Sequence, residues 1–259
     1  MQGSVHPTAI VDSRARLASD VEVGPYTVIG PDVEIASGCR IGPHTVIAGA
    51  TSIGPNCRIW QFASIGDAPQ DKKYSGEATR LEIGAGNTIR EYCTLNRGTA
   101  QGGGVTTIGD DNWIMAYVHI AHDCRIGSRT IFANNAQLAG HVVVGDDAIL
   151  GGFTVVHQFC RIGAHSITGM GTIVLQDVPP YVKASGNPAQ PFGINTEGLR
   201  RRGYGTESIT ALKRAYKALY RSSLTIEQVK DALAEEAQKS PEIQPLLDFV
   251  AVPGRGIIR

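Results

Sequence analysis

The segment His119-Ile120-Ala121-His122-Asp123-Cys124 holds two histidines and a carboxylate within six residues. A histidine followed by an acid suits a general base, because imidazole titrates near neutral pH and a carboxylate beside it fixes the tautomer and stabilises the imidazolium. Which of these side chains meet a substrate depends on the elements that carry them.

The elements that carry these side chains can be predicted from a repeat. An aliphatic residue recurs at every sixth position. The series comprises Val5, Val11, Leu17, Val23, Ile29, Ile35, Ile41, Ile47, Ile53, Ile59, Ile65, Ile83, Ile89 and Leu95 and, after a shift of one residue, Ile108, Ile114, Ile120, Ile126, Phe132, Leu138, Val144, Leu150, Val156 and Ile162. A six-residue step fits neither a helix nor a plain strand, so each hexad predicts a short strand and a corner. Such repeats are typical of parallel β-helices.

Two segments interrupt the repeat. Residues 67–81 break the pattern but keep its phase, whereas residues 96–105 shift it by one. Both are predicted to be loops that leave the solenoid wall, and loops on a rigid scaffold often carry binding groups.

The repeat ends near Pro179-Pro180, and apolar residues then follow a three- and four-residue spacing that predicts helices. Thr225 and Gln228 match a capping box at the start of one of them. We therefore predict a β-helix domain over residues 1–190 and a helical domain over residues 191–259.

The five cysteines each lie two residues before a repeat aliphatic, which predicts an inward position in a short strand. They are Cys39, Cys57, Cys93, Cys124 and Cys160. We expect buried thiols rather than disulfides or zinc ligands. The formal net charge is zero, so no global field indicates nucleic acid, and no leader or membrane-spanning run is apparent. The expected location is the cytoplasm.

Residues eighteen apart in a three-sided coil lie above one another, separated by about 4.8 Å. Steps of eighteen from His122 reach Gly140 and Gln158, with His141 and His157 next to them. Polar side chains of successive coils therefore meet in one column, which favours a site there. A backbone N–H at Gly140 is open to a developing oxyanion.

Other histidines are interpreted differently. His119 precedes an inward Ile120, so it faces outward beside the column. For His6, His44 and His165 we expect solvated positions on the wall.

Two alternatives to a general-base site stay open at this point. A zinc site built from His119, His122 and His141 is one, since gamma-class carbonic anhydrases place three histidines on such a solenoid. A purely structural solenoid is the other.

Segments outside the repeat carry a family resemblance. They are Gln61–Gly66, Asp71, Lys73-Tyr74, Gly76-Glu77, Thr79-Arg80, Arg97–Thr99, His119–Cys124, Asn134-Asn135, Leu138–His141, His157–Phe159, Gln176–Tyr181, Asn195, Glu197-Gly198 and Arg201–Gly203. In this ordered set the chain resembles the acyl-carrier-protein-dependent UDP-N-acetylglucosamine O-acyltransferases of lipid A synthesis. The resemblance implies a mainly β fold, a left-handed parallel β-helix with a C-terminal α-helical domain.

The resemblance also implies the reaction. The 3-hydroxyl of UDP-N-acetylglucosamine would attack the thioester of a 3-hydroxyacyl carrier protein, with His122 as base, Asp123 orienting it and the Gly140 amide stabilising the oxyanion. No metal or other cofactor is implied, because the carrier protein itself brings the acyl donor. The family is a homotrimer whose sites lie between adjacent solenoids, and no integral membrane segment is expected.

Further positions match substrate-binding positions of the family. The implied contacts are Asp71, Lys73, His119, His141, His157 and Gln158 around the sugar and acyl groups, and Asn195, Glu197 and Arg201 at the uridine and phosphate end. An arginine fork suits a diphosphate. The family often has histidine where this chain has Asn96, which cannot carry a proton at neutral pH, so Asn96 is left out of the catalytic set.

Two further features concern the acyl donor. The position of Met170 closes the acyl groove in the family, so a methionine there predicts a shortened chain, nearer 3-hydroxydecanoyl than 3-hydroxytetradecanoyl. Basic residues also gather after Gly198. Because carrier proteins are acidic, we predict a docking surface that includes Arg202, Lys213, Arg214 and Lys217.

Overall fold

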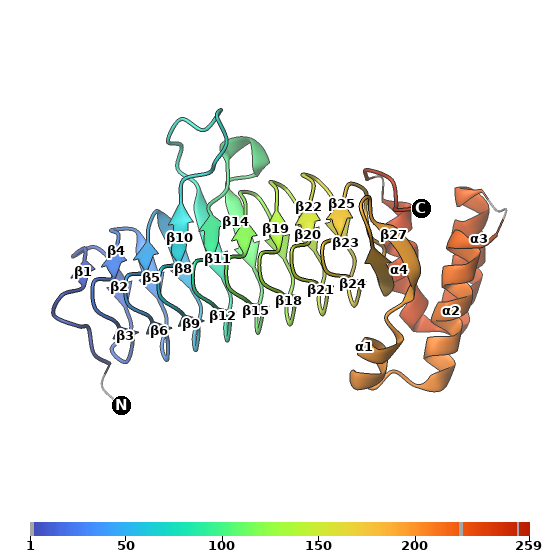
Figure 1. Ribbon diagram of the computed structural model, residues 1–259, viewed down its shortest axis with the longest axis horizontal. Helices are drawn as coiled ribbons and strands as arrows, with labels where there is room; N and C mark the ends of the chain where they lie inside the picture. Colours follow the sequence, from blue (N-terminus) through green and yellow to red (C-terminus); the bar gives the residue numbers. More distant parts are fainter. Residues whose placement is uncertain (1–2, 223–224, 253) are drawn as a thin grey trace.

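The computed structural model describes residues 3–222, 225–252 and 254–259. Short strands alternate with corners and form an elongated prism, with helices at its C-terminal end (Figure 1). The fold is the predicted parallel β-helix followed by a helical part.

Within the described residues the strands form three sheets, one on each side of the prism. The first sheet contains β1 (Ile10–Val11), β4 (Val28–Ile29), β7 (Val46–Ile47), β10 (Ser64–Asp67), β13 (Thr94–Asn96), β16 (His119–Ile120), β19 (Gln137–Leu138), β22 (Val155–Val156) and β25 (Ile173–Val174). The second contains β2 (Arg16–Leu17), β5 (Val33–Ile35), β8 (Ala50–Ile53), β11 (Arg80–Ile83), β14 (Val105–Ile108), β17 (Arg125–Ile126), β20 (Val143–Val144) and β23 (Arg161–Ile162). The third contains β3 (Glu22–Val23), β6 (Arg40–Ile41), β9 (Arg58–Ile59), β12 (Thr88–Ile89), β15 (Trp113–Ile114), β18 (Ile131–Phe132), β21 (Ile149–Leu150), β24 (Ile167–Thr168), β26 (Val182–Ser185) and the antiparallel β27 (Gln190–Ile194).

The prism is filled by the residues that the period marks as inward. The repeat aliphatics from Val23 to Ile162 are buried, and all five cysteines are fully buried as free thiols, as predicted. Burial raises the pKa of the Cys93 and Cys124 thiols to about 12, so these groups stay protonated at neutral pH. Val5 differs because it lies in the terminal coil and is 51% exposed.

The length of each loop that interrupts the six-residue repeat explains whether the repeat resumes in the same phase. Ile65 pairs with Leu95, thirty residues later instead of eighteen, so the first loop (residues 68–79) inserts twelve residues, or two whole hexads. Leu95 pairs with Ile120, twenty-five residues later, so the second loop (residues 97–104) inserts seven and shifts the phase by one. Both loops leave the prism along the same edge (Figure 1).

The helical part packs around its own apolar core, which includes Leu212, Leu233 and Leu246. Its elements are α1 (Thr196–Arg201), α2 (Thr206–Tyr220), α3 (Ile226–Lys239), the 3-10 turn η2 (Pro241–Ile243) and α4 (Gln244–Ala251). Thr225 and Gln228 form the predicted capping box at α3.

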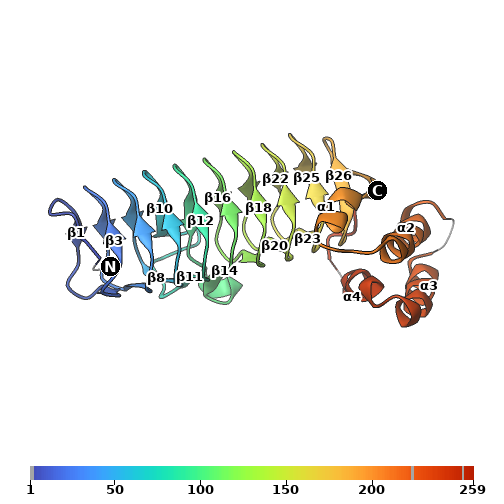
Figure 2. The same cartoon turned by 90° about the horizontal axis from the view of Figure 1, so that it is seen from below.

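The chain end returns to the solenoid, as both views show (Figures 1 and 2). The Asp177 N–H donates to Gly256 O over 2.8 Å, and the Ile258 N–H donates to Asp177 O over 2.9 Å. The helical part is therefore tied to the last coils at both of its ends.

The expectation of a solvated His165 is wrong. Its ring stacks on Tyr181 with centroids 5.6 Å apart, and its Nε2 lies 3.2 Å from the Tyr204 hydroxyl. Burial lowers the pKa of His165. The period identifies the corner that this residue occupies, but Tyr204 comes from a segment outside the repeat.

Candidate active site

The column of polar residues predicted from the eighteen-residue step is present. The His141 N–H donates to His122 O over 3.0 Å, and the Phe159 N–H donates to Gly140 O over 3.1 Å. These bonds stack three successive corners of the prism, so side chains far apart in sequence share one edge.

His122 and Asp123 form a buried pair at this edge. The His122 Nδ1 lies 2.8 Å from Asp123 Oδ2, and the two side chains are 15% and 0% exposed. A carboxylate only accepts hydrogen bonds, so Nδ1 carries the proton of the neutral ring and Nε2 keeps a free lone pair. The arrangement can take a proton from a bound hydroxyl.

Gly140 lies directly against the His122 ring. A Cβ at this position would be 2.5 Å from His122 Cε1 and 2.7 Å from Nε2, so only glycine fits. Within the described residues its N–H donates to no protein acceptor. A free N–H beside a base is the geometry that an oxyanion requires.

His141 completes the cluster from the next coil. Its Nε2 is 3.6 Å from Asp123 Oδ2, and its ring meets that of His122 edge-on, with centroids 5.1 Å apart. Burial lowers the pKa of His141, while the negative charges of Asp123 and Asp71 partly oppose that shift. Asp71 belongs to the first loop, so the charge of that loop is felt at this cluster.

The first loop is fixed to the solenoid by Arg97. The guanidinium donates to Gly66 O over 2.8 Å and to the Tyr74 hydroxyl over 3.0 Å, and it lies over the Tyr74 ring. Within the loop, the Lys73 N–H donates to the Asp71 carboxylate over 3.0 Å. The two predicted sugar contacts, Asp71 and Lys73, therefore lie on an anchored loop.

The remaining predicted contacts along this edge differ in exposure. The His119 Nδ1 is 2.7 Å from the Thr94 hydroxyl, and burial lowers the pKa of His119. The His157 Nδ1 is 3.1 Å from Gln158 O, and the Gln158 side chain is exposed one coil beyond Gly140. Gln158 is thus open to a ligand, whereas His119 is held by its neighbour.

The residues predicted for the uridine and phosphate end lie on α1, on the side of the prism away from the loops (Figure 1). Asn195 caps α1, accepting from the Gly198 N–H and donating to His165 O over 3.0 Å. Glu197 pairs with Arg200, and Arg201 is exposed. In a single chain these residues are separate from the His122 column.

Arg202 differs from its predicted place on a docking surface. Its Nε donates to Asp147 Oδ1 over 2.9 Å, and its other nitrogens donate to Asp147 O and Gly198 O. Burial alone would raise the pKa of Asp147, but hydrogen bonds from Arg129 and Arg202 outweigh it and lower the pKa. Arg202 joins α1 to the solenoid because α1 ends over this corner.

The three histidines of the zinc alternative do not come together in the structure. Among the described residues, the group of possible metal ligands whose donor atoms lie within 4.8 Å of one another is His122, Asp123 and His141. The alternative required His119 in place of Asp123. His119 is outside the group, and its Nδ1 is engaged by Thr94.

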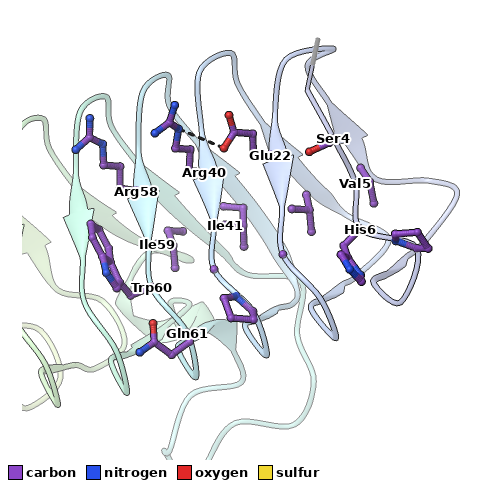
Figure 3. A pocket seen from close by; sticks show the side chains of 15 residues that line it. Ser4, Val5, His6, Glu22, Arg40, Ile41, Arg58, Ile59, Trp60 and Gln61 are labelled. Atoms are coloured by element: carbon purple, nitrogen blue, oxygen red, sulfur yellow. Dashed lines mark ion pairs between the residues drawn. The ribbon is translucent and has the colours of Figure 1, made fainter. Parts of the chain in front are cut away.

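A separate groove of about 690 Å³ lies over the N-terminal coils of the third sheet (Figure 3). Arg40, Arg58 and Trp60 line it, and Arg40 pairs with Glu22 at 3.3 Å. Arg90 lies over the Trp60 ring, 5.1 Å from its centroid. No predicted site residue lines this groove, so its arginines serve below as controls.

Sequence reasoning missed the residues that hold Asp123. Thr99, on the second loop, donates to both carboxylate oxygens, and the Thr106 hydroxyl accepts the Asp123 N–H over 2.8 Å. The available signals were the shift of the repeat at this loop and the resemblance of Arg97–Thr99 to the family, which mark the segment but not its partner.

Comparison with known proteins finds two matching family models and closely similar sequences. The family model described as "Udp N-acetylglucosamine O-acyltransferase; Domain 2" matches residues 177–258, and a bacterial transferase hexapeptide model matches residues 14–49, 32–67 and 106–140. The acyl-[acyl-carrier-protein]–UDP-N-acetylglucosamine O-acyltransferase of Thiobacillus denitrificans is 61% identical over 256 residues, covering 99% of both chains.

Solved structures give the same result. The chain is similar to LpxA from Acinetobacter baumannii, with a TM-score of 0.96, 49% identity and coverage of 98% and 99% of the two chains. It is also similar to UDP-N-acetylglucosamine O-acyltransferase from Moraxella catarrhalis, with a TM-score of 0.97, 45% identity and the same coverage. In the described part of the chain, none of the helices has the length and apolar character needed to cross a membrane.

Proposed function

The chain belongs to the family of acyl-[acyl-carrier-protein]–UDP-N-acetylglucosamine O-acyltransferases, and we propose that His122 is the general base of its acyl transfer. The reaction places the chain in lipid A synthesis. The observation that carries the proposal is the buried His122–Asp123 pair, whose free Nε2 lies beside the Gly140 amide. Because the chain belongs to this family, we favour acyl transfer over the zinc hydratase and the purely structural solenoid.

The proposed step balances within this site. The 3-hydroxyl of the glucosamine forms a C–O bond with the thioester carbonyl while His122 Nε2 takes its proton, and Asp123 stabilises the resulting imidazolium. The Gly140 N–H donates to the oxyanion of the tetrahedral intermediate. The C–S bond then breaks, and the imidazolium returns the proton to the leaving sulfur of the carrier protein.

The first loop and the column place the acceptor sugar in this proposal. The charge of Asp71 acts on His141 from the anchored loop, which also carries Lys73, and His141, with Gln158 one coil further, borders the acyl and sugar groups. The anchoring of this loop by Arg97 supports a preformed pocket wall. His119 and His157 flank this column and complete its outer side.

We place the nucleotide end between neighbouring subunits of a homotrimer. Asn195, Glu197 and Arg201 lie on another side of the prism from His122, so one chain cannot bring them to the same ligand (Figure 1). A second solenoid beside the His122 edge supplies them. No cofactor is needed in this scheme, and five buried free thiols agree with a cytoplasmic location.

The test of the proposal is acyl transfer to UDP-N-acetylglucosamine from carrier-protein thioesters of several chain lengths. We expect one ester product, with the acyl group on the 3-hydroxyl, and no turnover when the thioester is replaced by the free acid. Transfer to a different sugar position, or none with any donor, contradicts the proposed chemistry.

Met170 is expected to limit the acyl chain. Its side chain is 80% exposed in the single chain, beside Gly152 of the preceding coil, so it is free to line a groove formed with a neighbouring subunit. Replacing Met170 with glycine should raise kcat/KM for 3-hydroxytetradecanoyl carrier protein about tenfold or more, the effect expected for relieving a steric block. Kinetics with ten- and fourteen-carbon donors measure this.

The matched control for Met170 is Ile10→Gly, which removes another exposed apolar side chain, from β1 at the N-terminal end of the prism. It should leave the ratio of the two donors unchanged. A Met170→Gly enzyme that keeps the wild-type ratio contradicts the proposed role.

A basic surface on α2 is the proposed docking site for the acidic carrier protein. Lys213, Lys217 and Arg221 border a groove of about 730 Å³ with the exposed Phe192, whereas Arg214 at its rim pairs with Glu236. Arg202 is excluded by its bonds to Asp147.

Charge reversal tests this surface. Lys213→Glu with Lys217→Glu should raise the carrier-protein KM about tenfold at low salt, with a smaller effect at high salt, and should leave the sugar-nucleotide KM unchanged. Adding Arg214→Glu should raise it further, although loss of the Glu236 pair contributes to that step. The control is Arg40→Glu with Arg58→Glu in the N-terminal groove, and an equal rise there would contradict docking on α2.

A further inference from the structure

We infer that Thr99 is a positioning residue that holds the Asp123 carboxylate against His122, and that the second loop forms the cradle in which it does so. The inference rests on the proposed role of His122 as base. It concerns a residue of the loop that breaks the hexad pattern, not one of the stacked column.

Thr99 binds both oxygens of the carboxylate. Its N–H donates to Asp123 Oδ1 over 2.9 Å, and its hydroxyl donates to Oδ2 over 2.6 Å. Thr99 is 1% exposed and the Asp123 side chain is fully buried, so water cannot replace these donors. Oδ2 also accepts a hydrogen bond from His122 Nδ1, so the threonine hydroxyl and the imidazole both donate to the same oxygen.

The rest of the loop is shaped around the same carboxylate. Thr99 caps the 3-10 turn η1 (Ala100–Gly102), and its hydroxyl accepts the Gly102 N–H over 3.2 Å. A Cβ on Gly102 would lie 2.0 to 2.2 Å from the Asp123 carboxylate atoms. Gly103 then turns the chain back with φ of 97°, a region that favours glycine.

The geometry has a direct consequence for the base. A buried carboxylate held only by His122 would be free to rotate about its side-chain torsions, and the Nδ1–H bond that fixes the tautomer would weaken with it. With three donors on its two oxygens, Asp123 has one orientation. Thr99 therefore acts on the chemistry through Asp123, without touching the substrate.

The test compares Thr99→Val, which has nearly the same shape but no hydroxyl, with Thr99→Ser, which keeps the donor. We expect Thr99→Val to lower kcat about 10- to 100-fold, the range for losing a hydrogen bond to a charged group, with both KM values within twofold of wild type. Thr99→Ser should keep most of kcat. The melting temperature of each variant shows whether it is folded.

The Asp123→Asn background separates positioning from a general structural role. If Thr99 acts through the carboxylate, Thr99→Val should lower kcat no further once Asp123 is an amide. Equal losses in Thr99→Val and Thr99→Ser, or a full loss in the Asp123→Asn background, would overturn the inference. Wild-type activity in His122→Ala would instead overturn the proposed base, so the two failures are distinguishable.

Discussion

Replacing His122 with alanine is expected to lower kcat by about 10² to 10⁴, the contribution of a positioned general base. The substitution removes the Nε2 that takes the proton, and with it the hydrogen bond to Asp123 at 2.8 Å. The KM for UDP-N-acetylglucosamine should change little, because His122 acts mainly on the transition state. Steady-state kinetics with the preferred carrier-protein thioester measure both constants.

The control for His122 is His44→Ala. His44 also occupies a corner of the solenoid, but it stacks between Tyr26 and Phe62, away from the column. We expect it to keep wild-type kcat. A His122→Ala enzyme within about tenfold of wild type would contradict a general-base role.

Replacing Gly140 with alanine is expected to lower kcat by about 10²- to 10³-fold, comparable to the loss of an oxyanion donor. The added Cβ would be 2.5 Å from His122 Cε1, so the imidazole or the Gly140 backbone must move. Because Asp123 fixes the ring from its other side, either shift separates Nε2 and the Gly140 N–H from their working positions. The fold should survive, since the nearest atoms belong to one side chain.

A double variant decides whether the clash is the cause. In His122→Ala the atoms nearest to the new Cβ are absent, so adding Gly140→Ala should lower kcat by less than it does in wild type. Gly30→Ala is the matched control, because its Cβ would be 3.5 Å from Ile47 O, an ordinary contact at a corner of an earlier coil. Full additivity of His122→Ala and Gly140→Ala would contradict the steric account.

The six-residue repeat explains why the column and the buried cysteines could be predicted from the sequence. It gives each coil its length, so the sequence alone predicts that His122, Gly140 and His141 share one column and that the cysteines lie in the core, as the structure has them. Within the repeat, the number of residues between two positions determines where they lie relative to each other in the prism. The prediction therefore holds for these positions, which all belong to the solenoid.

Three of the contacts that were missed have one partner outside the repeat. Thr99 reaches Asp123 from an insertion, and Arg202 reaches Asp147 from a helix fifty-five residues later. His165 meets Tyr204 in the same way. A hexad pattern carries no information on how such segments fold back, because their contacts depend on turn geometry and side-chain packing rather than on a count of residues.

Because the coils are stacked, equivalent positions on successive coils lie at fixed intervals along the axis of the prism. Each coil advances the chain along the prism axis by about 4.8 Å, which corresponds to about four methylene groups of an extended chain. Met170 follows His122 by forty-eight residues, nearly three coils, or about 13 Å along that axis. If Met170 is the stop for the acyl chain, as proposed, moving it by one coil would change the accepted chain by about four carbons. Chain length would then change in steps rather than continuously.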